Sequence, residues 1–183
     1  AGMVWVGSRY DLGLAVFSPS PRSYEPSTFP QVPGPGPGDF PLAPGKVESD
    51  EDYFYIPHFA KNWVLNPNST LGLTLYGNGG MNTTWPGSAG CLQDPPATGT
   101  YCAGAAGVNL EQLFVNTTYS RKINPQHSWG VSLILAYQKF KATGVGSFAM
   151  FSTDPANLSN TGDDDSMGWG LKLGWQGEVT PGL

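Results

Sequence analysis

Short stretches in which large apolar residues alternate with small or polar ones recur along the chain. The clearest covers residues 128–142, where every second residue from Trp129 to Tyr137 is large and apolar. The same alternation marks the end of the chain, from Trp169 to Trp175. A period of two is that of a β-strand with one apolar face. We expect six strands, near residues 4–17, 47–60, 69–77, 110–123, 128–142 and 166–178.

The predicted connections alternate between long and short. Long loops are expected at 18–46, 78–109 and 143–165, and tight turns at 66–68 and 124–127. Long loops on one side and tight turns on the other are typical of a transmembrane β-barrel, as are aromatic residues at both ends of an apolar face. The fold class predicted is all-β, an antiparallel transmembrane β-barrel, with residues 1–183 forming part of one barrel domain.

Composition supports this prediction over that of a soluble β-sandwich. Charged residues make up only 13% of the chain, whereas the exposed face of a sandwich is normally rich in charge. The sequence contains no uninterrupted apolar run of about 18 residues, so no transmembrane helix is predicted. The net charge of −5 argues against nucleic acid as a partner, since phosphate binding requires a basic surface.

The segment 71–81, LGLTLYGNGGM, is a strand that runs into a glycine cluster. A phosphate-binding loop would continue into a helix, but the next residues, NTTWP, do not favour one. We therefore interpret the glycines as a distortion of a sheet strand. Pro57 lies in the preceding predicted strand and indicates a second break in pairing, because proline cannot donate to a ladder.

The two cysteines, Cys91 and Cys102, enclose a segment rich in proline and glycine. Such a pair predicts a disulfide, and with it an oxidising compartment. Half of a metal site is the alternative, but His58 and His127 are the only histidines and neither is near in sequence.

No constellation for catalysis is visible. The acidic run at 163–165 lacks the spaced oxygens of a calcium loop and is interpreted as a solvated loop end. No Ser-His-Asp set, paired acid or nucleophile elbow occurs. We predict that the protein is not an enzyme and has no cofactor and no metal.

Several large apolar residues fall in the predicted long loops. Such residues either pack the loops together or form a binding surface. If they bind, they form an apolar capture groove for hydrophobic molecules. The candidates are Met81, Trp85, Phe148, Met150, Phe151 and Leu158.

The segments LGLTLYGNGGMNTTWP, GVNLEQLFVNTTYSRKINPQHSWGVSLILAYQKFKATG, YFYIPHFA and NLSNTGDDDSMGWGLKLGW resemble the FadL/TodX family of outer-membrane transporters for fatty acids and hydrocarbons. The resemblance implies a fourteen-stranded barrel with an N-terminal plug, of which this chain holds about six or seven strands. It implies a Gram-negative outer membrane and lateral exit of ligand beside a kinked third strand. The corresponding wall positions are Pro57, Tyr76, Gly77, Asn78, Gly79 and Gly80.

The predicted function is passive uptake of hydrophobic compounds, such as long-chain fatty acids or hydrocarbons, by groove capture and lateral release. The predicted partners are membrane lipid, hydrophobic small molecules (fatty acids, hydrocarbons, detergent) and the rest of the same barrel. Two alternatives stay open, a general porin-like or structural outer-membrane barrel and a secreted β-rich adhesin or binding module.

Overall fold

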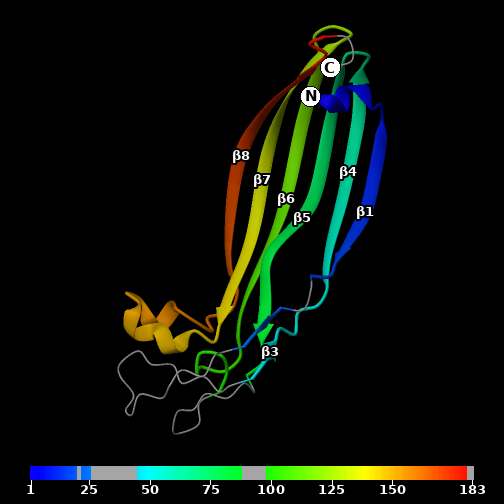
Figure 1. Cartoon of the computed structure of the whole chain (residues 1–183). Coiled ribbons are helices and arrows are strands. Elements are labelled where there is room, and N and C mark those ends of the chain that lie inside the picture. The colour runs from blue at the N-terminus through cyan, green and yellow to red at the C-terminus, as the bar shows by residue number, and fades with distance from the viewer. Residues whose placement is uncertain (20–21, 26–44, 88–97, 181–183) are drawn as a thin grey trace.

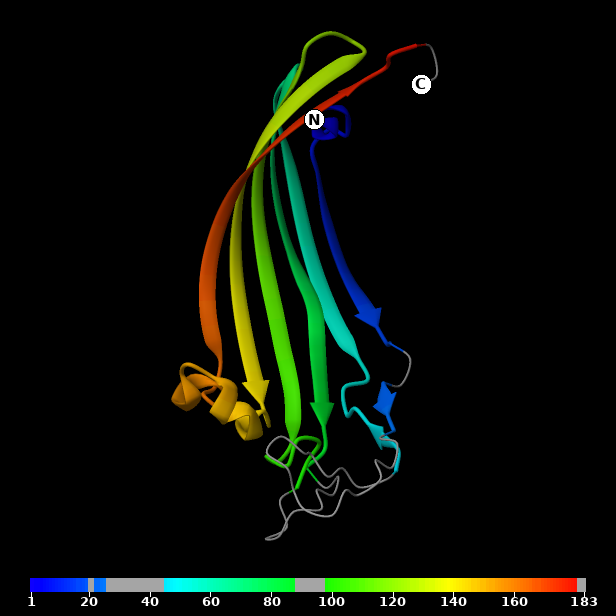
Figure 2. The same cartoon turned by 60° about the vertical axis from the view of Figure 1, so that its left-hand side comes forward.

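The computed structural model describes residues 1–19, 22–25, 45–87 and 98–180. Its main body is one antiparallel sheet of six strands in the order β1-β4-β5-β6-β7-β8, curved along its length (Figures 1 and 2). A two-stranded sheet, β2 with β3, lies beyond the end of the main sheet that carries the long connections. The strands are β1 Arg9–Phe17, β2 Ser23–Tyr24, β3 Val47–Glu48, β4 Phe54–Asn66, β5 Ser69–Trp85, β6 Ala106–Lys122, β7 His127–Thr143 and β8 Asp164–Gly177.

Three short 3-10 helices complete the described part of the chain: η1 (Gly2–Trp5), η2 (Gly146–Phe151) and η3 (Pro155–Asn157). Helix η1 lies at the end of the sheet that carries the tight turns, and η2 and η3 lie at the opposite end (Figure 1). No helix in the described ranges is long and apolar enough to cross a membrane.

The structure corrects the expected bounds of the first two strands. Residues 4–8 do not extend the first strand, because η1 and then Gly7, at φ +70°, turn the chain before β1 begins at Arg9. The expected strand 47–60 is divided into β3 and β4, and β4 continues to Asn66. It ends there because the Asn66 side chain accepts the backbone N–H of Asn68 at 2.9 Å and closes the turn into β5.

The expected loop 78–109 is shorter than predicted. Strand β5 continues through the glycine cluster to Trp85, and β6 begins at Ala106. The strand persists because its backbone remains paired with β6 from Ser69 to Trp85, apart from one register shift. Within the expected loops 18–46 and 143–165, the described residues include the short strand β2 and the helices η2 and η3.

The distribution of apolar and polar side chains is the reverse of that in a water-soluble protein: apolar side chains are exposed and polar ones are buried. One face, called the outward face here, carries large apolar side chains that are open to the surroundings, with Leu173 81% and Leu12 74% exposed. Among the described residues, the buried hydrophobic side chains are only Val4 and Ala106. The largest fully buried side chains of the described residues are those of Thr70, Ser120 and Ser128. An apolar exterior with a polar interior is the pattern of a barrel wall in lipid.

The N-terminal segment identifies the opposite face as the interior of the barrel wall, called the lumen face here. The buried Asn62 side chain donates to the backbone carbonyls of Met3 at 3.0 Å and Gly7 at 2.6 Å. Trp5 donates its indole N–H to the Ser128 hydroxyl at 3.1 Å. A Cβ at Gly72 would lie 2.2 Å from the Met3 methyl group, so this glycine leaves the space that the segment fills.

Candidate functional site

The wall divides where β4 and β5 separate. Their pairing runs from the turn up to His58–Tyr76 and ends there. Beyond that point the residues of β4 pair with β1, whereas those of β5 pair with β6. Strand β5 bends at about half its length (Figure 1). The divergence opens a pocket of about 560 Å³ between the two strands.

The predicted wall residues lie at this divergence. Tyr76 is the last β5 residue paired with β4, and its partner His58 is the neighbour of Pro57. Pro57 keeps its register with Leu14 of β1, so the predicted break in pairing there is on the β5 side only. Gly77, Asn78 and Gly79 all keep their register with β6. The register shifts between Gly79 and Met81, the interval that contains the predicted wall position Gly80. The break in pairing is therefore on the β4 side of β5 only.

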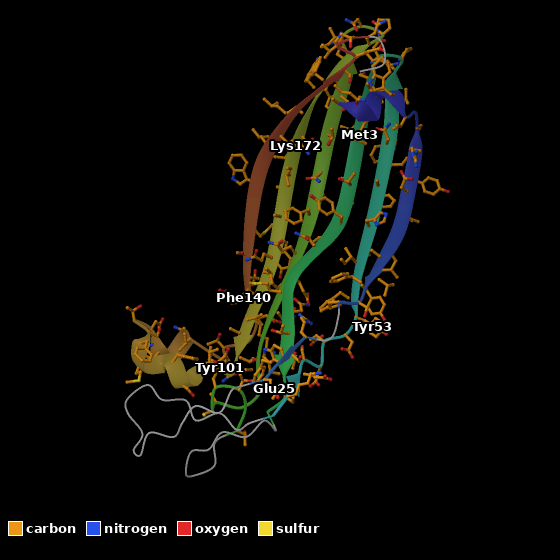
Figure 3. All side chains as sticks on the ribbon, viewed as in Figure 1. Met3, Glu25, Tyr53, Tyr101, Phe140 and Lys172 are labelled. Carbon is orange, nitrogen blue, oxygen red and sulfur yellow. The ribbon has the colours of Figure 1, made fainter. Side chains whose placement is uncertain are left out.

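The pocket is lined by a mainly apolar wall with a few polar groups. Its apolar residues come from the end of β1, from the start of β4 and the residue before it, from the outer half of β5 and from β6. They include Phe17, Tyr53, Phe54, Tyr55, Ile56, Met81 and Leu110. The polar residues are Arg22, Glu51, Asn78, Asn82, Glu111 and Gln112. Tyr53 lies beside the start of β4, on the same side of the molecule as β1 (Figure 3).

A row of amide side chains on the lumen face holds the outer half of β5 against its remaining neighbours. Asn78 donates to Gln112 at 3.2 Å, and Gln112 donates to Gln138 at 2.7 Å. One row closer to the turns, the rings of Tyr76 and Phe114 stack with centroids 5.3 Å apart. These contacts connect β5 to β6 and β7 at the level where the contact with β4 is lost.

Arg22 fixes the outer rim of the pocket. Its guanidinium donates to the backbone carbonyl of Asn82 in β5 and, at 2.8 Å, to that of Glu51. The same group lies over the Phe54 ring, 5.5 Å from its centroid. Arg22 therefore joins both sides of the opening through the backbone, although the two strands no longer pair there.

The six apolar loop residues fall into two kinds. Trp85 packs edge-on against Tyr24 with centroids 5.1 Å apart, and Phe148 packs in the same way against Tyr101 at 5.3 Å. A hydrogen bond of 2.9 Å between Tyr24 and Thr100 connects the two pairs. Trp85, Phe148 and Leu158 are half-buried, whereas Met81, Met150 and Phe151 are between 53% and 71% exposed.

The histidines, the acidic run and the cysteines were the other candidates from the sequence. Both histidines and Asp163 lie against neighbouring residues of the sheet, and one cysteine lies outside the described residues. His58 lies against Gly13, and His127 stacks on Trp175 with centroids 5.3 Å apart. Asp163 pairs with Lys139 at 3.3 Å. Across the described ranges no group of three or more potential metal ligands gathers. Cys91 is outside the described residues, so the pairing of Cys91 with Cys102 stays a prediction.

Sequence reasoning did not single out Arg22, Glu51 or Asn62. The acidic run GKVESDED was a usable signal for Glu51, because a dense charge run in a chain with 13% charged residues is unusual. Arg22 gave no comparable signal, since its contacts come from β5 and from the segment between β3 and β4.

Comparison with known proteins supports the fold. No protein-family model matches the chain, and no curated protein matches it in sequence. Solved structures match it in three dimensions, among them the two that follow. The P. putida toluene transporter TodX has a TM-score of 0.63 at 16% identity, with 96% of this chain and 44% of that chain covered. A Pseudomonas aeruginosa FadL homologue has a TM-score of 0.55 at 17% identity, with 99% and 43% covered.

The chain therefore spans less than half the length of the solved structures that it matches. The strands β1 and β8 each have one neighbour in the described sheet, which is the arrangement of a partial barrel. The resemblance predicted from the motifs is confirmed at the level of the fold: the chain is similar to part of the antiparallel β-barrel of TodX and of a FadL homologue.

Proposed function

We propose that this chain forms part of the wall of a Gram-negative outer-membrane channel for the passive uptake of hydrophobic compounds such as long-chain fatty acids or hydrocarbons. The ligand leaves the barrel sideways, through the opening between β4 and β5. The observation that carries the proposal is the end of β4–β5 pairing at His58–Tyr76, with an apolar pocket beside it. On this proposal the protein is not an enzyme, and the remaining strands of the barrel complete the wall.

The outward face supports placement in lipid. Leu171, Leu173 and Trp169 on β8 are all more than two-thirds exposed. Exposure of so many large apolar side chains to water would be unfavourable. Near the tight turns, Trp129 packs edge-on against Tyr119 with centroids 5.7 Å apart. At the other end of the apolar rows of β7 lies Tyr137. Aromatic residues at these two levels match the interfacial girdles of a membrane barrel.

Capture begins on the exposed apolar residues at the loop end of the sheet. Met81 is the clearest of these, because it is 53% exposed and also lines the wall pocket. Met150 and Phe151 on η2 offer further exposed surface. Burial of about 200 Å² of apolar ligand surface would contribute about 5 kcal/mol at 25 cal/mol per Å². That is enough to concentrate a sparingly soluble molecule beside the opening without coupling to an energy source.

Lateral release is tested by a covalent bridge across the opening. The bridge joins Ile56→Cys to Gly77→Cys, because a Cβ at Gly77 would lie 3.7 Å from a methyl carbon of Ile56 across the opening. We expect oxidation to lower the uptake of a radiolabelled hydrophobic ligand by cells about tenfold or more, and reductant to restore it.

The matched control places the bridge between the same strands where they already pair. Ala60 and Thr74 are register partners in β4 and β5. An Ala60→Cys and Thr74→Cys bridge should leave uptake unchanged in both redox states. Full uptake through the oxidised Ile56–Gly77 bridge would contradict lateral release between these strands.

A further inference from the structure

The charged groups at the wall pocket suggest which ligands it accepts. Its lining contains one guanidinium, that of Arg22, and two carboxylates, those of Glu51 and Glu111. The pocket therefore carries a net negative charge. A carboxylate ligand that enters it meets like charges against an apolar wall, where charge–charge repulsion is poorly screened.

The one cation among the described lining residues is already held by contacts within the protein. The Arg22 guanidinium donates to the backbone carbonyls of Asn82 and Glu51 and is stacked on Phe54. Its Nε atom is buried and has no hydrogen-bond partner, so a ligand has no access to it. Arg22 therefore stabilises the rim of the pocket and is not available to bind an anionic ligand.

The two carboxylates have hydrogen bonds but no ion pair among the described residues. Glu51 accepts the Thr84 hydroxyl at 2.9 Å, and Glu111 accepts the Asn109 amide at 3.0 Å. Lys139, the register partner of Glu111 on β7, is paired with Asp163 at 3.3 Å. Neither Glu51 nor Glu111 therefore forms a direct ion pair among the described residues, although Lys139 lies across from Glu111 on the neighbouring strand.

The segment that supplies Glu51 adds to this negative charge and is held in place at the opening. The Ser49 hydroxyl accepts the backbone N–H groups of Glu51 at 3.4 Å and of Thr84 at 3.2 Å. The backbone N–H of Asp50 donates to the Thr84 carbonyl at 2.9 Å. The one lysine of the run, Lys46, pairs with Glu48, whose carboxylate raises the pKa of the Lys46 ammonium.

The sequence offers no cation from the other outer connections. All nine lysines and arginines lie outside residues 26–44 and 88–97, and each of those two segments contains an aspartate, Asp39 and Asp94. The two segments therefore add negative charge and no positive charge to the composition of the chain.

We propose that the wall pocket passes neutral hydrophobic molecules in preference to their anionic counterparts, with Glu51 and Glu111 as the residues that determine this selectivity. The inference rests on the proposed function and narrows its substrate class. The amides of Asn78, Asn82 and Gln112 in the pocket wall accommodate a ligand hydroxyl or an aromatic ring without requiring a charge.

The test compares two ligands that differ only in the end group, 1-dodecanol and dodecanoate. Uptake of each radiolabelled compound is measured at pH 8 in cells that contain the full-length protein and lack their own transporters of this kind. The quantity compared is the uptake ratio of acid to alcohol. We expect the alcohol to enter about tenfold faster or more. The ratio should rise about tenfold in the Glu51→Gln, Glu111→Gln double variant, in which glutamine still accepts the same hydrogen bonds.

The control is Asp52→Asn, which removes the same charge from the same acidic run at an exposed residue that does not line the pocket. It should leave the ratio unchanged. An uptake ratio near one in the wild-type protein, or a ratio that the double variant does not alter, would overturn the charge selectivity while leaving uptake itself in place. Uptake of both compounds that is independent of the protein would instead overturn the proposed function, and this inference with it.

Discussion

The wall formed by β6, β7 and β8 and the junction of β4 with β5 are built from the same kind of sequence but behave differently. Strands β6 and β7 stay in register from Lys122–Ser128 to Gly107–Thr143 without a shift. Strands β4 and β5 pair only from the turn to His58–Tyr76. In both regions large apolar residues alternate with small or polar ones. The opening therefore arises because β5 loses one neighbour, not because its own backbone ceases to be a strand.

The contrast shows how a barrel wall can open without a flexible loop. Beyond Tyr76 the outer half of β5 is held by β6, by the amide row through Gln112 and by the Arg22 bridge at the rim. The edge is thus rigid on one side and unpaired on the other. Unpaired backbone groups in hydrocarbon are costly, so on the proposed placement in a membrane we expect the divergence to lie at the membrane boundary or above it.

The largest expected effect is the loss of stability when an arginine is placed on the outward face, and it should depend on the depth of the substituted residue in the membrane. Leu171→Arg places a charge on the outward face of β8, opposite Leu133 in the middle of the apolar row. It should lower the free energy of unfolding by about 2–4 kcal/mol, whereas Tyr55→Arg, beside the opening, should cost about 1 kcal/mol or less. Urea titration of the full-length protein in lipid vesicles measures both.

The control places the same arginine on the opposite face of β8, at the residue before Leu171. Gly170 shares the lumen face of β8, and a Cβ there would meet no atom within 4 Å. Gly170→Arg should therefore be tolerated better than Leu171→Arg. Equal costs for these two variants would contradict the assignment of the outward face to lipid.

A smaller effect is expected from the row of amides that replaces β4 as a support for β5. Gln112→Ala removes both hydrogen bonds of the row, to Asn78 and to Gln138, and should destabilise the protein by about 1 kcal/mol. Amide exchange should quicken at residues 77–79 but not at 71–75, because only the latter are also paired with β4. Gln126→Ala, in the exposed turn before β7, serves as the control, and equal acceleration in both stretches would exclude a local support role.

The alternation of β7 and β8 could be predicted from sequence because lipid on one face and water on the other impose a strict period of two. The same signal failed for η1. Val4, Trp5 and Val6 suit a strand by composition, but Gly7 and the Asn62 side chain fold the segment onto the lumen face. Contacts with residues far along the chain decided that conformation, and a local pattern does not contain them.

The candidate site was predictable only in part for the same reason. Gly77 to Gly80 and Pro57 could be singled out from their local chemistry, since glycine and proline disturb ladders, and their role in a lateral opening stays a prediction. Arg22 was not, because its contact with Asn82 joins residues 60 positions apart. The apolar loop residues could be named as a set, but only the structure separates the packed Trp85 and Phe148 from the exposed Met81 and Phe151.

The smallest expected effect tests the cause of the opening. If β5 diverges because it lost β4, a side chain at Gly77 should change little. The backbone there is an extended strand, and a Cβ would meet Ile56 and Pro57 at ordinary contact distances of 3.7 and 3.8 Å. Gly77→Ala should shift the free energy of unfolding by less than about 0.5 kcal/mol.

The matched substitution in the continuously paired wall is Gly107→Ala. A Cβ at Gly107 would lie 2.2 Å from the Thr83 carbonyl oxygen, which is backbone and cannot move aside freely. This variant should lose about 1–3 kcal/mol. The comparison is made by urea titration of both proteins in the same vesicles. A Gly77 variant as damaged as the Gly107 variant would show that the glycine itself, and not the missing neighbour, creates the opening.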